Sequence, residues 1–422
     1  MLKFRGDVSH RMSQTLFFSA LGSGLGVLAW GQYSSPALAL LLPLLWVMAP
    51  GRMQAFVLTL TYHLAVVRFL PPYAGTWFES LYVGIFIWLG LGILSALAWT
   101  LFWPSRKRPW MTPVAVFLAL LVTIVSPVAL VMPGHPIMGL GFLWQAGGWV
   151  AVTAFLLLTP TLAYALIHQV PPVMRKTPGI QWFALLLLAT VVGLGGKKLD
   201  GDDATRGRVA GRIGAVHTQW GGFPADDTES VQRVMKMGTM VASLAGGNDG
   251  FDTVIFPETI IGRYEPGIHA VIKKEILSSA AITGQTVIMG AEIKTGAGLF
   301  QNAAIILRPD GSSSYISARQ TSPVANWRPW DSKAHYPADW LGTSTANVQR
   351  GVRARIMLCF EEYMPIMHLL SEAREEQELI IAMANRWASH NELSTTVQSG
   401  HTEGMALLFG RNWLRAENKP KK

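Results

Sequence analysis

The hydrophobic pattern divides the chain into two halves. Before about residue 199 the apolar residues form long runs, and after it they form short runs separated by polar turns. Most of the long runs approach the roughly 20 residues that a helix needs to cross a lipid bilayer. The pattern therefore predicts a bundle of about seven transmembrane helices in residues 1–199, with apolar runs near 15–31, 36–49, 53–69, 81–103, 112–132, 138–167 and 181–196.

A soluble stack of buried helices is the alternative for this half. Residues 112–167 contain no Asp, Glu, Lys or Arg, which argues against helices with a water-facing side. Trp30, Trp77 and Trp110 lie near the ends of runs, as is typical of the membrane interface. These features favour the membrane bundle.

The second half alternates between two hydrophobic periods. VQRVMKMGTMVASL, within a stretch near 227–245, repeats its apolar positions at helical spacing. Apolar runs near 252–259, 286–293 and 379–385 have the length of buried strands. Strands that alternate with helices predict an α/β sandwich, which we place at 207–417. The residues from Arg415 onward are polar, and we expect them to fray.

Composition and charge support this division. Half of the 422 residues are hydrophobic, 14% are charged and 16 are Trp, the profile of a protein with a large membrane part. The formal net charge of +9 is unevenly placed. Residues 1–199 hold 12 Lys and Arg against Asp7 and Glu79, whereas the rest holds 23 basic and 24 acidic residues. Because the excess lies between apolar runs, we expect no direct nucleic-acid binding.

The basic residues also predict an orientation. They gather before the first run and in alternate loops, at Lys3, Arg5, Arg11, Arg52, Arg106, Lys107, Arg108, Arg175 and Lys176. The positive-inside rule then places the N-terminus in the cytoplasm. With seven crossings of a bacterial inner membrane, the second half lies in the periplasm.

Two apparent strand ends carry the candidate chemistry. Glu258 follows VIFP, and Cys359, the sole cysteine of the chain, follows RIML. Functional groups of α/β sheets gather where strands end in loops. A thiol there needs a base, which a buried carboxylate with a raised pKa supplies, and donors for an oxyanion. The alternatives are an inert, buried Cys359 and a surface turn residue at Glu258.

The order of these motifs resembles the nitrilase (carbon–nitrogen hydrolase) superfamily. FPET at 256–259 resembles the motif of its general-base glutamate, and LCFEEYMP at 358–365 resembles its nucleophile motif. LIIAMANRWAS at 379–389 resembles the strand that comes next. A helical bundle ahead of such a domain is similar to apolipoprotein N-acyltransferase. The resemblance implies a nitrilase-like αββα sandwich after the bundle.

The resemblance also implies a mechanism. Cys359 would attack an ester of a membrane phospholipid, Glu258 would take the thiol proton, and Glu361 would help to position the intermediate. The acyl chain would then pass to an amine, such as the N-terminal amine of a lipoprotein. Among relatives of that acyltransferase, the chain most resembles proteins of conjugal plasmid transfer. Nothing else in the sequence indicates conjugation.

The chain departs from the family pattern at the catalytic lysine. That lysine lies five residues before a proline, and the position five before Pro323 holds Ala318. Arg319 is the candidate replacement, although a guanidinium is a poor proton donor. Lys294 and Lys333 are the other candidate cations, and a solvated Arg319 is the alternative. The family's acid after the proline is missing as well.

Three further assignments concern polar residues. Glu361 admits a purely structural role, as a cap or as a partner of Arg353 or Arg355. The histidines show no ligand spacing, and one cysteine does not make a thiolate metal site, so we predict neither a metal nor a cofactor. We assign His217 and His401 structural roles.

Two functions therefore stay open. The first is a membrane acyltransferase or amide-bond enzyme that works through an acyl-enzyme at Cys359. The second is a catalytically impaired relative that acts as a structural or assembly factor in conjugal transfer. The missing lysine favours the second, and the retained Glu258, Cys359 and Glu361 favour the first.

Overall fold

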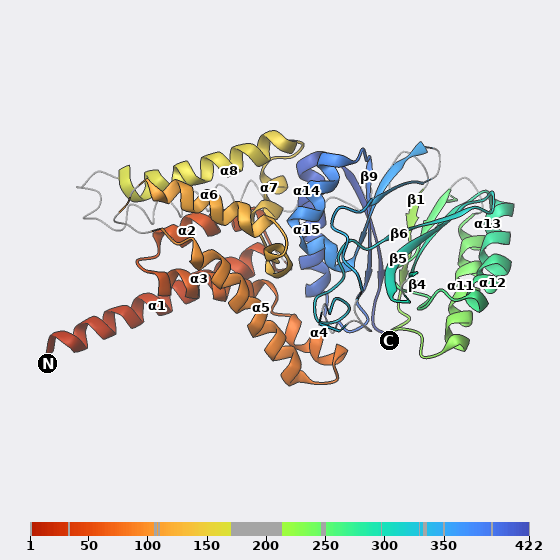
Figure 1. Ribbon diagram of the computed structural model, residues 1–422, viewed down its shortest axis with the longest axis horizontal. Helices are drawn as coiled ribbons and strands as arrows, with labels where there is room; N and C mark the ends of the chain where they lie inside the picture. Colours follow the sequence, from red (N-terminus) through yellow and green to blue (C-terminus); the bar gives the residue numbers. More distant parts are fainter. Residues whose placement is uncertain are drawn as a thin grey trace. The chain divides into compact units, whose positions relative to one another are not determined.

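The computed structural model divides into two compact units (Figure 1). The helical unit comprises Met1–Leu199, Tyr363–Ile366 and Asn391–Gly410, and the sandwich unit comprises Asp200–Glu362, Met367–His390 and Arg411–Lys422. The boundaries 1–199 and 207–417 remain predictions. The residues described are 2–32, 34–104, 108, 110–169, 213–245, 250–296, 298–328, 330–331, 336–348, 351–389 and 391–421.

The described part of the helical unit consists of helices joined by short 3-10 turns and one π turn. Its helices are α1 (Leu2–Ala29), α2 (Leu42–Met48), α3 (Arg52–Val66), α4 (Leu70–Trp77), α5 (Leu81–Leu101), α6 (Met111–Ile124), α7 (Leu140–Leu143), α8 (Gly148–Tyr164) and α15 (Leu393–Phe409). The turns are η1 (Pro36–Leu41), η2 (Val128–Val131), η3 (Pro136–Gly139) and η4 (Ala165–Gln169).

Glycines allow two helices of this unit to pack closely. A Cβ atom at Gly22 of α1 would lie 2.2 Å from the carbonyl oxygen of Leu58 in α3. One at Gly26 would lie 2.6 Å from the carbonyl oxygen of Tyr62. Small residues four apart allow this backbone approach in membrane helix pairs, where the hydrophobic effect between helices is weak.

Three described helical segments are long and apolar enough to cross a membrane: Arg11–Ala29, Leu81–Leu101 and Gly148–His168. A fourth results if α3 and α4, which are bent by 59°, form one span. This is fewer than the predicted seven. Helix α6 has 14 residues, or about 21 Å of length, which is shorter than the hydrocarbon layer. The run at 36–49 begins as a 3-10 turn at Pro36, and the run at 181–196 lies outside the described residues.

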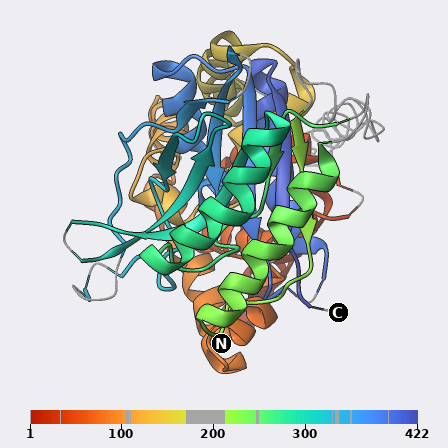
Figure 2. The ribbon, with the colours of Figure 1, turned by 90° about the vertical axis from the view of Figure 1, so that its right-hand side faces the viewer.

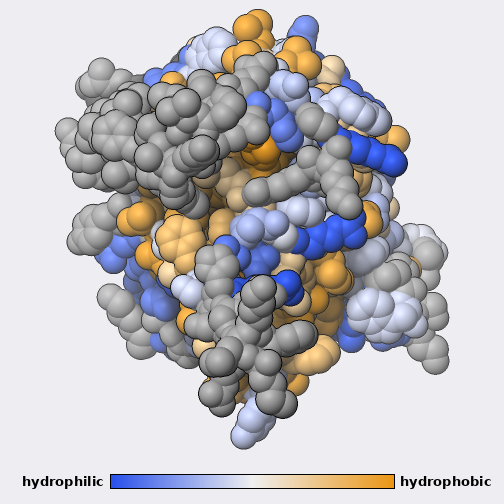
Figure 3. Space-filling model, turned by 90° about the vertical axis from the view of Figure 1, so that its left-hand side faces the viewer, coloured by the Kyte–Doolittle hydropathy of each residue, from blue (hydrophilic) through white to orange (hydrophobic). Residues whose placement is uncertain are grey.

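Many apolar side chains on these helices are exposed. Only 22% of the apolar window of α5 is buried, so the helix is not a core helix of a soluble bundle. Figure 3 shows exposed apolar side chains, in orange, among polar ones on one face of the molecule. The exposed large apolar residues of α5 include Leu81, Tyr82, Val83, Ile85, Phe86, Leu89, Ile93, Leu94, Leu97 and Leu101.

The described part of the sandwich unit contains two five-stranded sheets. The first has the order β1-β3-β4-β5-β6, with β1 (Ile213–Ala215), β3 (Thr253–Ile255), β4 (Thr286–Lys294), β5 (Phe300–Leu307) and β6 (Ser313–Ser317). The second has the order β2-β10-β9-β8-β7, with β2 (His217–Thr218), β10 (Asn412–Asn418), β9 (Leu379–Asn385), β8 (Arg353–Leu358) and β7 (Thr345–Asn347). Strands β8, β9 and β10 are mutually parallel, so their carboxyl ends share one edge.

The layers follow from which face of each strand is apolar. Ile255 and Ile306 of the first sheet and Ile356 and Ile381 of the second belong to one buried cluster between the sheets. Helices α11 (Asp227–Leu244), α12 (Pro266–Ile272) and α13 (Ser278–Thr283) cover the other face of the first sheet (Figure 2). Helix α14 (Pro365–Arg374) contacts β8, because Arg355 donates to the His368 carbonyl oxygen at 3.0 Å. The order helix, sheet, sheet, helix agrees with the predicted α/β sandwich.

The end of the chain contradicts one expectation. The residues from Arg415 were expected to fray, but β10 pairs with β9 along its whole length, from Asn412 to Asn418. Leu414 and Ala416 enter the cluster between the sheets. Arg415 and Glu417 are buried and form ion pairs. Pairing of the charges therefore allows a polar sequence to form a buried strand.

We expect Ile93→Arg to reduce recovery of the protein in the membrane fraction, because an arginine at the middle of a lipid-facing helix costs about 2.5–3.5 kcal/mol. Ile93 is 42% exposed, so an arginine there does not have to enter a packed core. The same change at a comparably exposed position of a water-facing helix should be tolerated. The control is Met235→Arg on α11, where Met235 is 50% exposed. Equal behaviour of the two variants in membrane fractionation would contradict a lipid-facing α5.

Candidate active site

Cys359 lies directly after the last residue of β8 and begins the 3-10 turn η7 (Cys359–Tyr363). Its φ angle is +48°, in the left-handed region that a side chain with a Cβ atom seldom adopts. A strained residue persists only where its surroundings fix it, and such residues cluster at functional sites. The buried strand before it and the buried Glu361 and Glu362 after it supply that support.

Glu258 lies three residues after β3 and is 8% exposed. Its Oε2 accepts a hydrogen bond of 2.9 Å from the backbone N–H of Asn385, at the end of β9. Its Oε1 accepts one from Nδ2 of Asn302 on β5. A Cβ atom at Gly290 would lie 2.4 Å from the Glu258 Cα, so glycine there allows the backbone after β3 to approach β4.

Glu258 has the electrostatic character of a base at neutral pH. Burial raises its pKa to about 7, and the charge of Glu362 acts in the same direction. Hydrogen bonds from the Cys359 thiol, the Asn385 backbone and Asn302 oppose this rise. A carboxylate with a pKa near neutrality both takes and returns a proton efficiently.

The thiol of Cys359 is protonated in this environment. Burial raises its pKa well above the ordinary value, followed by the charge of Glu258, the hydrogen bond to Glu258 and the charge of Glu362. The nearby Arg415 opposes them. The residue as a whole keeps partial exposure, although protein atoms surround its sulfur. At pH values above the pKa of Glu258, the pair is a neutral thiol that donates to a carboxylate, and reaction requires transfer of that proton.

Glu361 connects the turn after Cys359 to the segment after β6. Its Oε1 accepts from the backbone N–H groups of Arg319 at 2.5 Å and Gln320 at 3.2 Å, and its Oε2 accepts from that of Leu358 at 3.0 Å. Burial raises its pKa, and Arg319 and these hydrogen bonds oppose the rise. Its ion-pair partner is Arg319, at 3.9 Å, rather than Arg353 or Arg355. These contacts suit a positioning role.

Arg319 is buried rather than solvated. Its Nη2 donates to the Met367 carbonyl oxygen at 3.0 Å, and its Nε lies 3.9 Å from Glu361. The guanidinium is thus held by α14 and by the turn after Cys359. A direct role of Arg319 at an oxyanion remains a prediction.

The position at which the resemblance to nitrilases predicts a lysine is part of the core. Ala318 is 5% exposed, belongs to the cluster between the sheets, and donates its backbone N–H to the Asn302 carbonyl oxygen at 2.7 Å. Lys294 is exposed at the end of β4, and Lys333 lies outside the described residues.

Sequence reasoning missed Asn302 and a network of buried charges. Arg415 bonds to Glu362 and pairs with Glu417 at 3.4 Å, and Glu417 also pairs with Arg386. Glu362, three residues after Cys359, links this network to the nucleophile turn. The alternation of apolar and charged residues along β10 was the available signal for these pairs.

The sequence assigns structural roles to two histidines, His217 and His401, and predicts no metal site. His217 is exposed on β2, and His401 is buried in α15. Among the residues that the structure describes, no group of three His, Cys, Asp or Glu side chains is placed to hold a metal ion. The prediction that the protein uses no metal and no cofactor stays a prediction.

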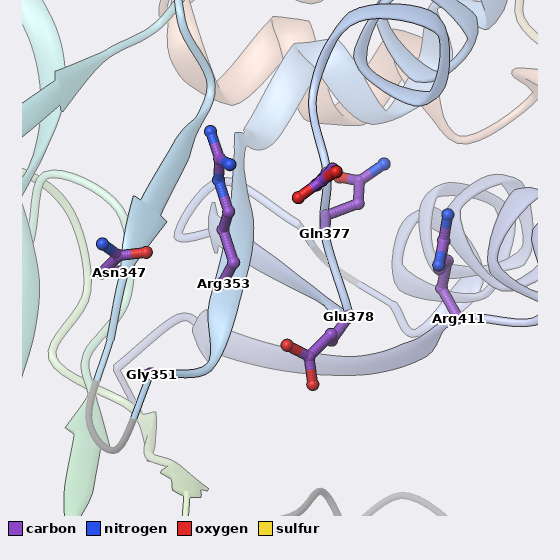
Figure 4. A pocket seen from close by; sticks show the side chains of 7 residues that line it. Asn347, Gly351, Arg353, Gln377, Glu378 and Arg411 are labelled. Atoms are coloured by element: carbon purple, nitrogen blue, oxygen red, sulfur yellow. The ribbon is translucent and has the colours of Figure 1, made fainter.

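A polar pocket lies at the other end of the second sheet (Figure 4). Its volume is about 320 Å³. Arg353 in its lining is the first residue of β8, whereas Cys359 follows the last, so the pocket is separate from the thiol. Its two arginines and two glutamates do not favour a ligand of one sign. The lining residues are Asn347, Gly351, Arg353, Glu376, Gln377, Glu378 and Arg411.

Comparison with known proteins adds relatives but no family assignment. No family model matches the chain. The chain is 25% identical over 403 residues to a probable conjugal transfer protein TraB of Sinorhizobium fredii, covering 92% of this chain and 94% of that protein. It is 24% identical over 424 residues to the conjugal transfer protein TraB of Agrobacterium fabrum, covering 94% and 91%. The predicted resemblance to conjugal-transfer proteins is confirmed.

Solved structures similar to this chain match about half of it. An amidase of the nitrilase superfamily from Nesterenkonia sp. AN1 covers 49% of this chain and 75% of its own, with 13% identity and a TM-score of 0.36. A CN-hydrolase superfamily protein from Xanthomonas campestris covers 49% and 75%, with 18% identity and a TM-score of 0.36. The site geometry above stands independently of these similarities.

We expect Glu361→Gln to lower the free energy of unfolding by about 2–4 kcal/mol, because one carboxamide oxygen cannot accept all three buried N–H groups. The measurement is thermal or denaturant unfolding in detergent. The exposed Glu376, changed to Gln, is the matched control and should be neutral. A neutral Glu361→Gln would show that this carboxylate does not hold the turn.

We expect Glu258→Gln to lower the pKa of the Cys359 thiol, because one carboxylate that disfavours the thiolate is removed. Each unit of decrease raises the thiolate fraction about tenfold below the pKa. The chain has one cysteine, so the pH profile of alkylation by iodoacetamide reports on it directly. If the inflection of the alkylation profile stays at the same pH in Glu258→Gln, or moves to higher pH, the contact between Glu258 and Cys359 is contradicted.

Proposed function

We propose that the chain is a membrane-anchored enzyme with a nitrilase-like fold that forms a thioester at Cys359 and serves conjugal plasmid transfer. The observation that carries the proposal is the hydrogen-bonded pair of Glu258 and Cys359, placed at strand ends of two different sheets. The pKa of Glu258, about 7, suits a general base. The relatives named for conjugal transfer support the biological process.

The first half-reaction acylates the thiol. As the Cys359 sulfur attacks the carbonyl carbon of an ester, its proton moves to Glu258. The new S–C bond forms, the ester C–O bond breaks, and Glu258 returns the proton to the departing alcohol oxygen. Glu361 holds the turn that carries the sulfur, and Arg319 is the candidate cation for the oxyanion.

The second half-reaction releases the acyl group. An amine nitrogen attacks the thioester carbon, the S–C bond breaks, and the proton lost by the amine restores the thiol by way of Glu258. A membrane phospholipid is the proposed donor, because apolar, exposed helices such as α5 suit a lipid environment. The amine of a lipoprotein, or of another acceptor, is the proposed acceptor.

The proposed location follows from the positive loops. The protein would cross a bacterial inner membrane several times, with its N-terminus in the cytoplasm and the sandwich unit in the periplasm. A periplasmic site would meet lipids and acceptors at the outer surface of that membrane.

One observation favours a second function. The family's lysine position holds the buried methyl group of Ala318, so the cation usually paired with the base is replaced or lost. A catalytically impaired protein would then serve conjugal transfer as a structural or assembly factor.

We expect Cys359 to carry a hydroxylamine-sensitive acyl chain in membranes, and the label to disappear in Cys359→Ala. The initial rate of acylation should rise with pH through about 7, as Glu258 loses its proton and becomes a base. Glu258→Gln should slow acylation by about 10²–10⁴-fold and remove this pH step.

The outcome decides between the two functions. The acyltransferase proposal fails, and the assembly role remains, if intact, folded protein carries no acyl label under two conditions. The first is in membranes, and the second is with added short-chain phospholipid.

A further inference from the structure

A buried set of aromatic and polar groups in the helical unit centres on His401 of α15. The imidazole is fully buried and stacks on Trp30 of α1, with ring centroids 4.2 Å apart and planes 20° apart. The backbone N–H of Gly134 donates to its Nε2 at 2.7 Å. Its Nδ1 lies 2.6 Å from the Val397 carbonyl oxygen. Because Nε2 accepts, the proton is on Nδ1, and both nitrogens of a neutral ring are satisfied.

The same set is closed by α3. Trp30 donates from Nε1 to the Tyr62 hydroxyl at 2.9 Å, and that hydroxyl donates to the Gly134 carbonyl oxygen at 2.6 Å. Gly134 has a φ of +75°, and a Cβ atom there would lie 2.8 Å from a methyl group of Val66. Helices α1 and α3 and the loop at Gly134 therefore fix the position of His401.

One further contact joins His401 to the nucleophile turn. The ring of Tyr363 lies 5.3 Å from that of His401 between centroids, at an angle of 66°. Tyr363 is the last residue of η7, and Cys359 is the first. Glu361 and Glu362 between them are buried and hydrogen-bonded, so the turn has little freedom to absorb a displacement at its far end.

We propose that His401 is a positioning residue for the nucleophile: by holding Tyr363, it keeps the turn that begins at Cys359 in the strained conformation in which the thiol meets Glu258. Because Cys359 and Tyr363 are the two ends of one turn, a change at the His401 contact reaches the thiol along the chain. This inference deepens the proposed function by naming what controls its nucleophile. Its test does not depend on catalysis.

The test is the pH profile of Cys359 alkylation in the full-length protein in detergent micelles, with iodoacetamide as the probe. Tyr363→Leu and His401→Gln remove the ring contact from opposite sides. We expect the turn to relax away from Glu258 in both, so that the inflection falls toward that of an ordinary thiol and the rate near pH 8 rises about tenfold. The charged groups that act on the thiol, namely Glu258, Glu362 and Arg415, are retained in every variant.

Two matched variants separate positioning from general loosening. Tyr363→Phe keeps the ring and should keep the wild-type profile. Trp46→Phe removes a different fully buried tryptophan of the helical unit, which contacts Trp99 at 5.6 Å, and should also keep it. If His401→Gln does not fold, Tyr363→Leu decides, because Tyr363 is half-buried.

Two results would overturn the inference: an unchanged profile in folded Tyr363→Leu, or a shift in Trp46→Phe as large as that in Tyr363→Leu. Failure of the proposed function looks different. In that case Cys359 would carry no acyl chain, while the alkylation profile would still respond to Tyr363→Leu.

Discussion

One buried carboxylate holds the carboxyl ends of both sheets together. The two oxygens of Glu258 accept hydrogen bonds from Asn302 in the first sheet and from the backbone of Asn385 in the second. Cys359, also at the end of a strand of the second sheet, donates to the same carboxylate. Burial of a hydrogen-bonded carboxylate makes its charge costly, and this cost is the main cause that moves the pKa of Glu258 to about 7. The hydrogen bonds to the Glu258 carboxylate therefore both join the two sheets and hold the candidate base of the site.

Much of the sandwich unit was predictable, because its pattern is local. The stretch 379–385 was predicted as a strand and β9 has those bounds, and the helix predicted near 227–245 is α11. Glu258 and Cys359 could be nominated as site residues because each follows an apolar strand, where the pattern breaks abruptly, and their catalytic roles stay predictions. Asn302 was not found, because it lies inside a strand and gains meaning only from the neighbouring sheet edge.

The errors share a physical cause, which is that partners distant in the sequence decide the outcome. The count of seven helices relied on apolar runs, yet an apolar run does not distinguish a spanning helix from a 3-10 turn that starts at a proline. The residues from Arg415 looked like a tail because their charges were judged alone. Glu362 and Arg386, far away in the sequence, make those charges compatible with a buried strand.

Helix α15 has a consequence for how the molecule is built. It lies between β9 and β10 in the sequence, yet it belongs to the helical unit, where a Cβ atom at Gly404 would lie 1.9 Å from the Met138 carbonyl oxygen. Along the sequence, α15 comes before β10. The chain therefore packs against helices that lie more than two hundred residues earlier before it adds β10 to the second sheet. A fragment that starts after those helices would therefore leave the packing face of α15 bare. The change in composition near residue 199 therefore does not separate two self-contained modules, because α15 lies after it in the sequence and belongs to the helical unit.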